Sequence, residues 1–261
     1  MSTGTYTPRP GAAPVGRMIA AQTALETRML LRNGEQLLLT VIIPSLLLVL
    51  FSTVDIITVP DSTTGGTDKA VDFLAPGILA LAVLSTAFTG QAIATGFERR
   101  YGVLKRLGAS PLPRWALMTA KTLAVLVTEV LQIALLTAIA LGLGWSPHGN
   151  PLSVLLLLAL GTAAFSGLGL LMAGTLKAEA TLAAANLVFL LLLVGGGVIV
   201  PLEKFPDAAR SVLELLPISA LSDGLRAVLQ DGAALPWGDA LTLAVWAVLG
   251  LGAAAKFFRW E

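Results

Sequence analysis

Long runs of apolar residues, separated by polar stretches, dominate the chain. Each run is long enough to cross the ~30 Å hydrocarbon core of a bilayer as a helix, which takes about 20 residues. A helix also satisfies its backbone hydrogen bonds internally, as the bilayer core requires. The pattern therefore predicts an all-α integral membrane protein with six transmembrane helices. The runs cover residues 37–54, 73–94, 116–144, 151–176, 181–200 and 239–258.

A weaker helical pattern precedes the first run. In residues 15–36 the apolar side chains Val15, Met18, Leu25 and Met29 fall on roughly one helical face, and charged side chains occupy the rest. This pattern is typical of an amphipathic helix that lies in the membrane surface. A soluble cytoplasmic helix that packs on a partner protein would show the same pattern.

The composition agrees with a membrane protein. Hydrophobic residues make up 56% of the chain and charged residues 13%, whereas soluble domains average about 25% charged residues. Cysteine is absent, which excludes disulfides, thiolate nucleophiles and cysteine metal sites. The single histidine, His148, lies in a polar turn and has no second histidine or cysteine with which to bind a metal. A membrane-embedded enzyme is also disfavoured, because its acidic or histidine side chains would cluster at one depth.

The basic residues are distributed unevenly between the two sides of the predicted spans. Twelve lie in the segments 1–36, 95–115, 177–180 and the C-terminal end, and four lie in the connections on the opposite side. The positive-inside rule therefore predicts that both termini are cytoplasmic. The remaining one, Lys121, lies within the third run, and we expect it to snorkel towards the cytoplasmic surface.

One connection is unusually basic. Residues 96–115, GFERRYGVLKRLGASPLPRW, hold five of the chain's 17 Lys and Arg residues. Glycines and prolines bracket a segment that can form about two helical turns, which suggests a short helix presented to something in the cytoplasm. A charge cluster that only fixes topology would explain the charge equally well. The apolar side of the segment holds Val103, Leu104 and Leu107, and the basic side holds Lys105 and Arg106.

Residues 97–112 resemble the cytoplasmic signature between the second and third membrane helices of type-2 ABC-transporter permeases. In that signature an acidic residue is followed by glycine, a hydrophobic residue, leucine, a further leucine and finally Ser-Pro. The resemblance implies that the segment 96–114 is a coupling helix, which docks on a separate ATPase subunit. The positions that it assigns to ATPase coupling are Glu98, Gly102, Val103, Leu104, Lys105, Arg106, Leu107, Ser110 and Pro111.

The connection between the fifth and sixth spans, residues 201–233, also resembles this family. Its apolar residues recur at helical spacing but are interrupted by Pro217. The resemblance implies a re-entrant helical hairpin that closes the outer exit, with Pro217, Asp223 and Arg226 as gate residues. A surface amphipathic hairpin is the alternative. A buried Arg226 or Asp223 would favour the re-entrant hairpin, because interfacial helices expose their charges.

The nucleotide chemistry must come from another chain. The sequence contains no G-x-x-x-x-G-K-[ST] phosphate loop, so ATP and Mg are expected on a partner ATPase, with no cofactor or metal bound here. The family resemblance also implies a second permease subunit, identical or similar, because six spans are half of the usual transport unit. The net charge of +1 gives no case for a nucleic-acid partner.

Three polar residues within the spans are candidates for a substrate path: Glu129, Gln132 and Asn186. A carboxylate deep in a membrane is costly and usually faces a bundle interior or a wet cavity. Glu129 could contact substrate or a proton, or it could be a protonated side chain bonded to Gln132. Asn186 could line the path, although hydrogen bonding between helices is the more common role.

Together these observations predict a permease subunit of an ATP-driven exporter in a bacterial plasma membrane. The expected cargo is an amphiphilic small molecule such as a drug, an antibiotic or a lipid-like compound. Export of polysaccharide-type cargo by the same mechanism is one alternative, and an ion- or proton-coupled carrier with Glu129 as the titrating group is another. The predicted layout is a disordered tail (1–14), an interfacial helix (15–36) and a six-span domain (37–261).

Overall fold

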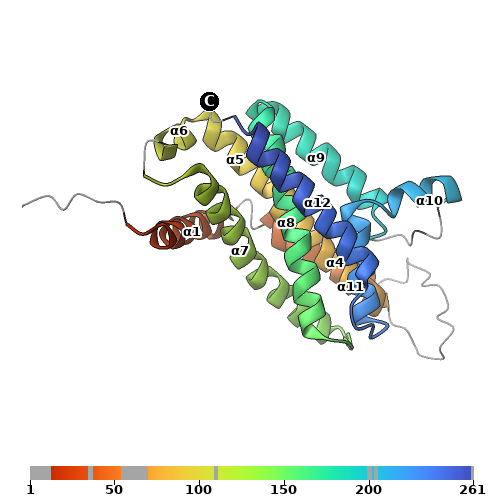
Figure 1. Ribbon diagram of the computed structural model, residues 1–261. Helices are drawn as coiled ribbons and strands as arrows, with labels where there is room; N and C mark the ends of the chain where they lie inside the picture. Colours follow the sequence, from red (N-terminus) through yellow and green to blue (C-terminus); the bar gives the residue numbers. More distant parts are fainter. Residues whose placement is uncertain are drawn as a thin grey trace, which may run out of the picture.

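The computed structural model describes residues 13–34, 38–53, 70–108, 111–198, 202 and 205–259, and the regular elements within these ranges are all helices (Figure 1). The all-helical prediction is therefore confirmed for the described part of the chain. In chain order the elements are α1 (Val15–Arg32), η1 (Leu38–Ile42), α3 (Ile43–Thr53), α4 (Ala70–Val83), η2 (Leu84–Gly90), α5 (Gln91–Arg100), α6 (Val103–Gly108), α7 (Arg114–Gly142), α8 (Pro151–Thr175), α9 (Ala178–Gly195), α10 (Asp207–Leu213), α11 (Pro217–Leu229) and α12 (Trp237–Phe257).

Five helices in the described residues are long and apolar enough to cross a membrane, rather than the six predicted. The first predicted run appears as a shorter apolar helix, Thr40–Thr53. Its neighbours 35–37 and 54–69 lie outside the described residues, so the described part of this run falls short of a full crossing. The five long helices are Ala70–Arg100, Trp115–Gly142, Pro151–Thr175, Ala178–Gly195 and Trp237–Phe257.

The continuous helix Ala70–Arg100 is the centre of the bundle. Its α4 segment is buried almost completely, and α3, α7, α8 and α11 all pack against it. The outer helices instead expose many large apolar side chains, such as Leu191 and Val248. An apolar exterior is what a bilayer requires, since lipid tails are as apolar as leucine.

Small residues bring α8 and α12 close together. A Cβ atom at Gly167 of α8 would lie 2.5 Å from the backbone nitrogen of Leu251 in α12. The two helices run parallel, because Ser153 donates a hydrogen bond to the carbonyl of Ala234 at one end and Arg259 donates its backbone N–H to Gly174 at the other. Close backbone approach through glycine is typical of membrane helix pairs.

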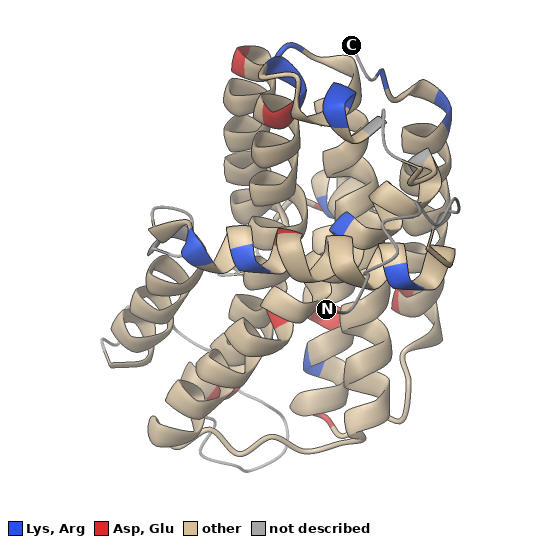
Figure 2. Ribbon diagram, turned by 90° about the vertical axis from the view of Figure 1, so that its left-hand side faces the viewer, with Lys and Arg blue, Asp and Glu red and all other residues tan. Residues whose placement is uncertain are grey.

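Helix α1 runs across the bundle rather than along it (Figures 1 and 2). It packs against α7, and the side chains that it buries there are Gln22 and Glu26. Its large apolar side chains, including Leu25 and Met29, are exposed. This arrangement suits a helix whose polar face contacts protein and whose apolar face contacts lipid.

The connection before α12 contains two short helices with different surroundings. Helix α11 is almost wholly buried and packs against α4, α8 and α12. Helix α10 buries none of its residues. The pair therefore has one inserted helix and one peripheral helix.

Candidate functional site

Lys and Arg residues gather at the end of the bundle that holds the C-terminus (Figure 2). There Arg99 donates a hydrogen bond to the carbonyl of Leu176, and Arg100 forms an ion pair with Glu179. These contacts join the end of α5 to the link between α8 and α9 and to the first turn of α9. We call this region the basic end of the molecule.

Helix α6 lies at the basic end, directly after α5 (Figure 1). The chain turns at Gly102, whose φ of 69° falls in the left-handed region that glycine adopts without strain. The carbonyl of Gly102 then accepts a hydrogen bond of 3.2 Å from the backbone N–H of Arg106. The short helix predicted in the basic connection is therefore present, and it packs against α5.

The faces of α6 differ from the prediction in one respect. Leu104 is 1% exposed, so it is wrong to expect it on an outward surface. A helix this short has little stability of its own, and Leu104 anchors it to the body of the protein. Lys105 and Arg106 are exposed, while Val103 and Leu107 are half-buried. Pro111 is exposed, and Ser110 lies outside the described residues.

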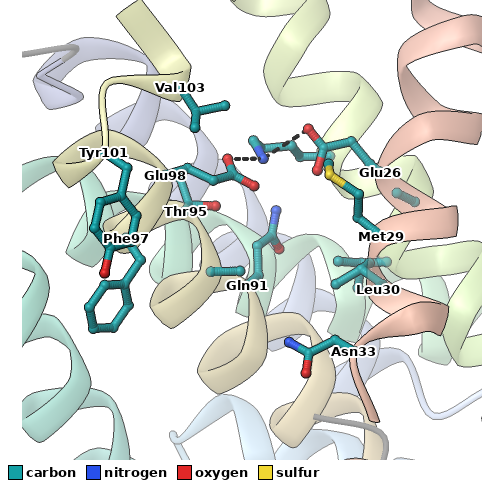
Figure 3. A pocket seen from close by; sticks show the side chains of 14 residues that line it. Glu26, Met29, Leu30, Asn33, Gln91, Thr95, Phe97, Glu98, Tyr101 and Val103 are labelled. Carbon is teal, nitrogen blue, oxygen red and sulfur yellow. Dashed lines mark hydrogen bonds and ion pairs between the residues drawn. The ribbon is translucent and has the colours of Figure 1, made fainter. Parts of the chain in front are cut away.

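Glu98 points into the bundle rather than towards a partner (Figure 3). Its Oε2 atom lies 2.5 Å from Nζ of Lys121, and Oε1 of Glu26 lies 3.0 Å from the same nitrogen. Lys121 is only 6% exposed, so the expectation that it snorkels is wrong. Two carboxylates hold its ammonium in place instead, because a charge within a bundle is stable there only when it is paired.

This charged cluster of Glu26, Glu98 and Lys121 joins three helices. Glu26 belongs to α1, Glu98 to α5 and Lys121 to α7. Gln22 of α1 supports it by donating a hydrogen bond of 2.8 Å to Oε1 of Glu26. Losing one partner from a buried ion pair costs about 3–5 kcal/mol, so the cluster ties the helix that precedes α6 to α1 and α7.

Glu129 and Gln132 lie within the bundle but do not pair with each other. Thr162 of α8 donates to Oε2 of Glu129 at 2.5 Å, and among the described residues Oε1 of Glu129 has no hydrogen-bond partner. Gln132 instead accepts from the hydroxyl of Thr86 at 2.8 Å and donates to the carbonyl of Thr40. Gln132 thus bridges the two π-helical segments, η1 and η2, which are rare elements often found at functional sites.

Asn186 lies apart from these two residues. It is exposed on α9, and its amide donates a hydrogen bond of 2.9 Å to the carbonyl of Leu182 one turn earlier. Helix α9 packs on α5 and α8. The structure therefore does not place Asn186 with Glu129 and Gln132.

Two of the three predicted gate residues, Asp223 and Arg226, meet at a buried guanidinium. Arg226 of α11 donates to Oδ1 of Asp223 at 3.0 Å, to the carbonyl of Val198 at 2.9 Å and to the carbonyl of Phe73 at 3.4 Å. Its guanidinium carbon also lies 4.0 Å from the centroid of the Phe73 ring, within the range of a cation–π contact. Pro217 is buried at the first turn of α11, and Asp223 is half-buried.

These observations describe a helical membrane protein with a basic, ion-paired end and an inserted helix at the opposite end. A family model described as "ABC-2 family transporter protein" matches residues 13–256. The chain belongs to the ABC-2 transporter family. Permeases of this family have no ATPase domain, so the chain is a multi-pass membrane permease and not an ATPase.

A curated relative agrees with this assignment. The chain is 26% identical over 235 residues to the "Putative transport permease YvfS" of Bacillus subtilis (strain 168). The aligned region covers 89% of this chain and 93% of the relative. The likeness therefore extends over nearly the full length of both proteins.

Proposed function

We propose that this ABC-2 permease is one subunit of an ATP-driven exporter, and that a separate ATPase docks on the exposed side of α6. The observation that supports the proposal is that α6 exposes a basic pair and is firmly attached to the bundle. Lys105 and Arg106 are exposed on it, Leu104 anchors it, and the preceding helix is ion-paired through Glu98 to Lys121. A force on α6 would therefore reach α1, α5 and α7 together.

In the proposed mechanism the ATPase binds and hydrolyses ATP with Mg, and its closure displaces α6. Gly102 sets the angle between α5 and α6, so the displacement tilts the central helix and α7 as nearly rigid bodies. Such a switch requires a contact that differs between two states of the protein. The proposed docking segment includes Val103, Leu107, Ser110 and Pro111 beside the basic pair, whereas Glu98 and Leu104 act as its internal anchors.

The same proposal places the basic end in the cytoplasm of a bacterial cell, with both termini on that side of the plasma membrane. The excess of Lys and Arg at this end supports that orientation. A second permease subunit, identical or similar, would complete the transport unit. The large apolar side chains that α9 and α12 expose are available to that subunit or to lipid.

We further propose that α10 and α11 form the outer gate as a re-entrant hairpin. The burial of Arg226 supports this, because a hairpin lying on the membrane surface would expose its charges. Arg226 also ties α11 to the central helix through the backbone of Phe73. A tilt of the central helix would therefore move Pro217, Asp223 and the rest of α11 with it.

The proposed cargo is an amphiphilic small molecule such as a drug, an antibiotic or a lipid-like compound. Among the three path candidates, Glu129 keeps one oxygen without a partner in the described residues, while Gln132 is engaged in contacts between helices. Asn186 faces outwards, where a path between two permease subunits would run. Membership of an ABC family favours ATP-driven transport over a proton-coupled carrier.

The test is co-purification with an ATPase. A tagged chain, purified in mild detergent from its own host, is expected to bring with it a soluble chain that has a phosphate loop and hydrolyses ATP. The double variant Lys105→Glu/Arg106→Glu should lower the recovery of that chain about tenfold, which corresponds to ~1.4 kcal/mol of binding. Undiminished recovery would contradict the proposed docking surface.

A matched control makes the same charge change elsewhere. Arg17→Glu/Arg28→Glu alters two exposed arginines of α1 and is expected to leave the recovery of ATPase unchanged. Both double variants should elute as the wild type does on size exclusion. An equal loss of ATPase in both would show that net charge, and not α6, determines the association.

A further inference from the structure

A cavity of about 250 Å³ lies beside the charged cluster, between α1, α5 and α7 (Figure 3). Met29, Leu30 and Val125 contribute apolar surface to it. Its rim includes Asn33 and Tyr101, whose side chains are exposed, so the cavity is open to its surroundings. Its volume lies slightly below the ~300–1,000 Å³ of pockets that hold drug-sized ligands, and it suits a smaller molecule or the head of a larger one.

Gln91 of α5 lines this cavity, and its side chain has no hydrogen-bond partner among the described residues. The residue is 4% exposed, and neither its amide nitrogen nor its amide oxygen forms a hydrogen bond within the described part of the protein. Figure 3 shows the side chain extending from α5 towards Glu98 and Glu26, with its amide nitrogen on the side of the carboxylates. Buried amides are nearly always hydrogen-bonded, so Gln91 is suited to an occupant that supplies the missing partner.

The charges around the cavity favour a cation as that occupant. Glu26 of α1 and Glu98 of α5 face a single ammonium, that of Lys121 of α7. Two carboxylates and one ammonium leave a formal charge of −1. The cavity lies next to this excess charge, and Lys121 and Gln91 beside it are almost fully buried. Electrostatic attraction is stronger around buried groups than in bulk solvent.

We propose that this cavity binds the ammonium head of a small organic monocation that carries an apolar arm. The ammonium donates one hydrogen bond to a carboxylate of the cluster and another to the amide oxygen of Gln91, which a half-turn of the amide brings to the same side. The arm packs against Met29, Leu30 and Val125. If the bound cation is also the exported cargo, the inference rests on the proposed function, and the exported amphiphile is then a cation. The proposed binding of a cation in this cavity does not depend on the proposed function.

Other occupants fit less well. A divalent metal ion would need more anionic ligands, and no group of three or more acidic, histidine or cysteine residues capable of holding a metal occurs in the described residues. The ammonium of Lys121 would repel a doubly charged ion about twice as strongly as a monocation. An anion would face the excess carboxylate, and a neutral alcohol would gain nothing from that charge.

The test is direct binding to the full chain in nanodiscs, measured by titration calorimetry against empty nanodiscs. The probes are hexylammonium, 1-hexanol and hexanoate, which share an apolar arm and differ in charge. Hexylammonium is expected to bind saturably and at least about tenfold more tightly than the other two. Equal binding of hexanol or hexanoate would overturn the proposal.

Two substitutions at Gln91 make the test specific to this cavity. Gln91→Leu keeps the side-chain size and removes the amide, and it should weaken hexylammonium binding about tenfold. Gln91→Glu adds a carboxylate and should bind hexylammonium at least as tightly as the wild type. Gln230→Leu, which changes a glutamine at the end of α11, should have no effect.

The outcomes separate this inference from the proposed function. Unchanged binding in Gln91→Leu, or weaker binding in Gln91→Glu, overturns the binding site whatever the ATPase does. Binding is measured without ATP or a partner, so failure to recover an ATPase leaves this result intact. Should Gln91→Leu fail to fold, Gln91→Glu and the comparison of probes still decide the question.

Discussion

At the scale of single residues, Lys121 illustrates how a buried charge can hold helices together. Lys121→Met keeps the apolar stem and removes the ammonium, which leaves Glu26 and Glu98 facing each other without a counter-charge. We expect the free energy of unfolding to fall by about 3–5 kcal/mol, the cost of breaking a buried ion pair. The free energy of unfolding is measured by denaturant titration of the detergent-purified chain, with circular dichroism as the signal.

Two comparisons show whether pairing is the cause. The triple variant Glu26→Gln/Glu98→Gln/Lys121→Met removes every charge of the cluster and should recover most of the lost stability. Arg210→Met breaks the ion pair between Arg210 and Glu214, whose side chains are 42% and 47% exposed, respectively. This substitution should lower the free energy of unfolding by less than about 1 kcal/mol. A Lys121→Met protein as stable as the wild type would show that the cluster does not hold the helices.

The sequence could not reveal this cluster. Lys121 lies in an apolar run, where snorkelling is the usual outcome for a lysine near a helix end, and its two partners belong to other helices. No local spacing signals such a contact. The outward placement expected for Leu104 fails for a related reason. Helical periodicity separates apolar from basic faces but does not say which face meets the rest of the protein.

At the scale of elements, the contact between α8 and α12 depends on Gly167. A methyl group there would lie 2.5 Å from the backbone nitrogen of Leu251 and 2.6 Å from the carbonyl carbon of Gly250. Backbone atoms cannot yield as a flexible side chain can, so Gly167→Ala should force the two helices apart. We expect a loss of about 1–3 kcal/mol, typical of an overpacked core, measurable as a lower unfolding midpoint.

Gly252 on α12 provides the matched control. It is exposed, and a Cβ atom there would meet nothing within 4 Å. Gly252→Ala should be neutral or stabilise by up to about 1 kcal/mol, because alanine favours the helix. If both substitutions have the same effect, helix propensity and not the close approach explains the result.

The sequence predicts the elements more reliably than their ends. The apolar run 73–94 predicts a span, but the helix extends from Ala70 to Arg100, because a helix can continue into charged residues that leave the hydrocarbon. The π-helical segments had no recognisable signal in the sequence. They depend on contacts such as the bridge from Gln132 to Thr86 and Thr40, which only the assembled bundle brings together.

At the scale of the whole molecule, charge distribution links the structure to its orientation. The basic end carries α6, and the opposite end carries the turn with His148, whose backbone N–H donates a hydrogen bond of 2.8 Å to Leu229 of α11. These two places should lie on opposite sides of the membrane. The side on which α6 lies determines whether an ATPase, which needs cytoplasmic ATP, can reach it at all.

The absence of cysteine makes this orientation directly measurable. Arg106→Cys and His148→Cys each introduce one thiol at an exposed position. In cells that express the chain without a partner ATPase, a membrane-impermeant maleimide should label His148→Cys in intact cells and Arg106→Cys only in inverted vesicles. His148 makes its contact through the backbone, so replacing its side chain should not disturb the fold. The reverse labelling pattern would place α6 outside the cell, where no ATP is available, and would remove the basis for ATP-driven export.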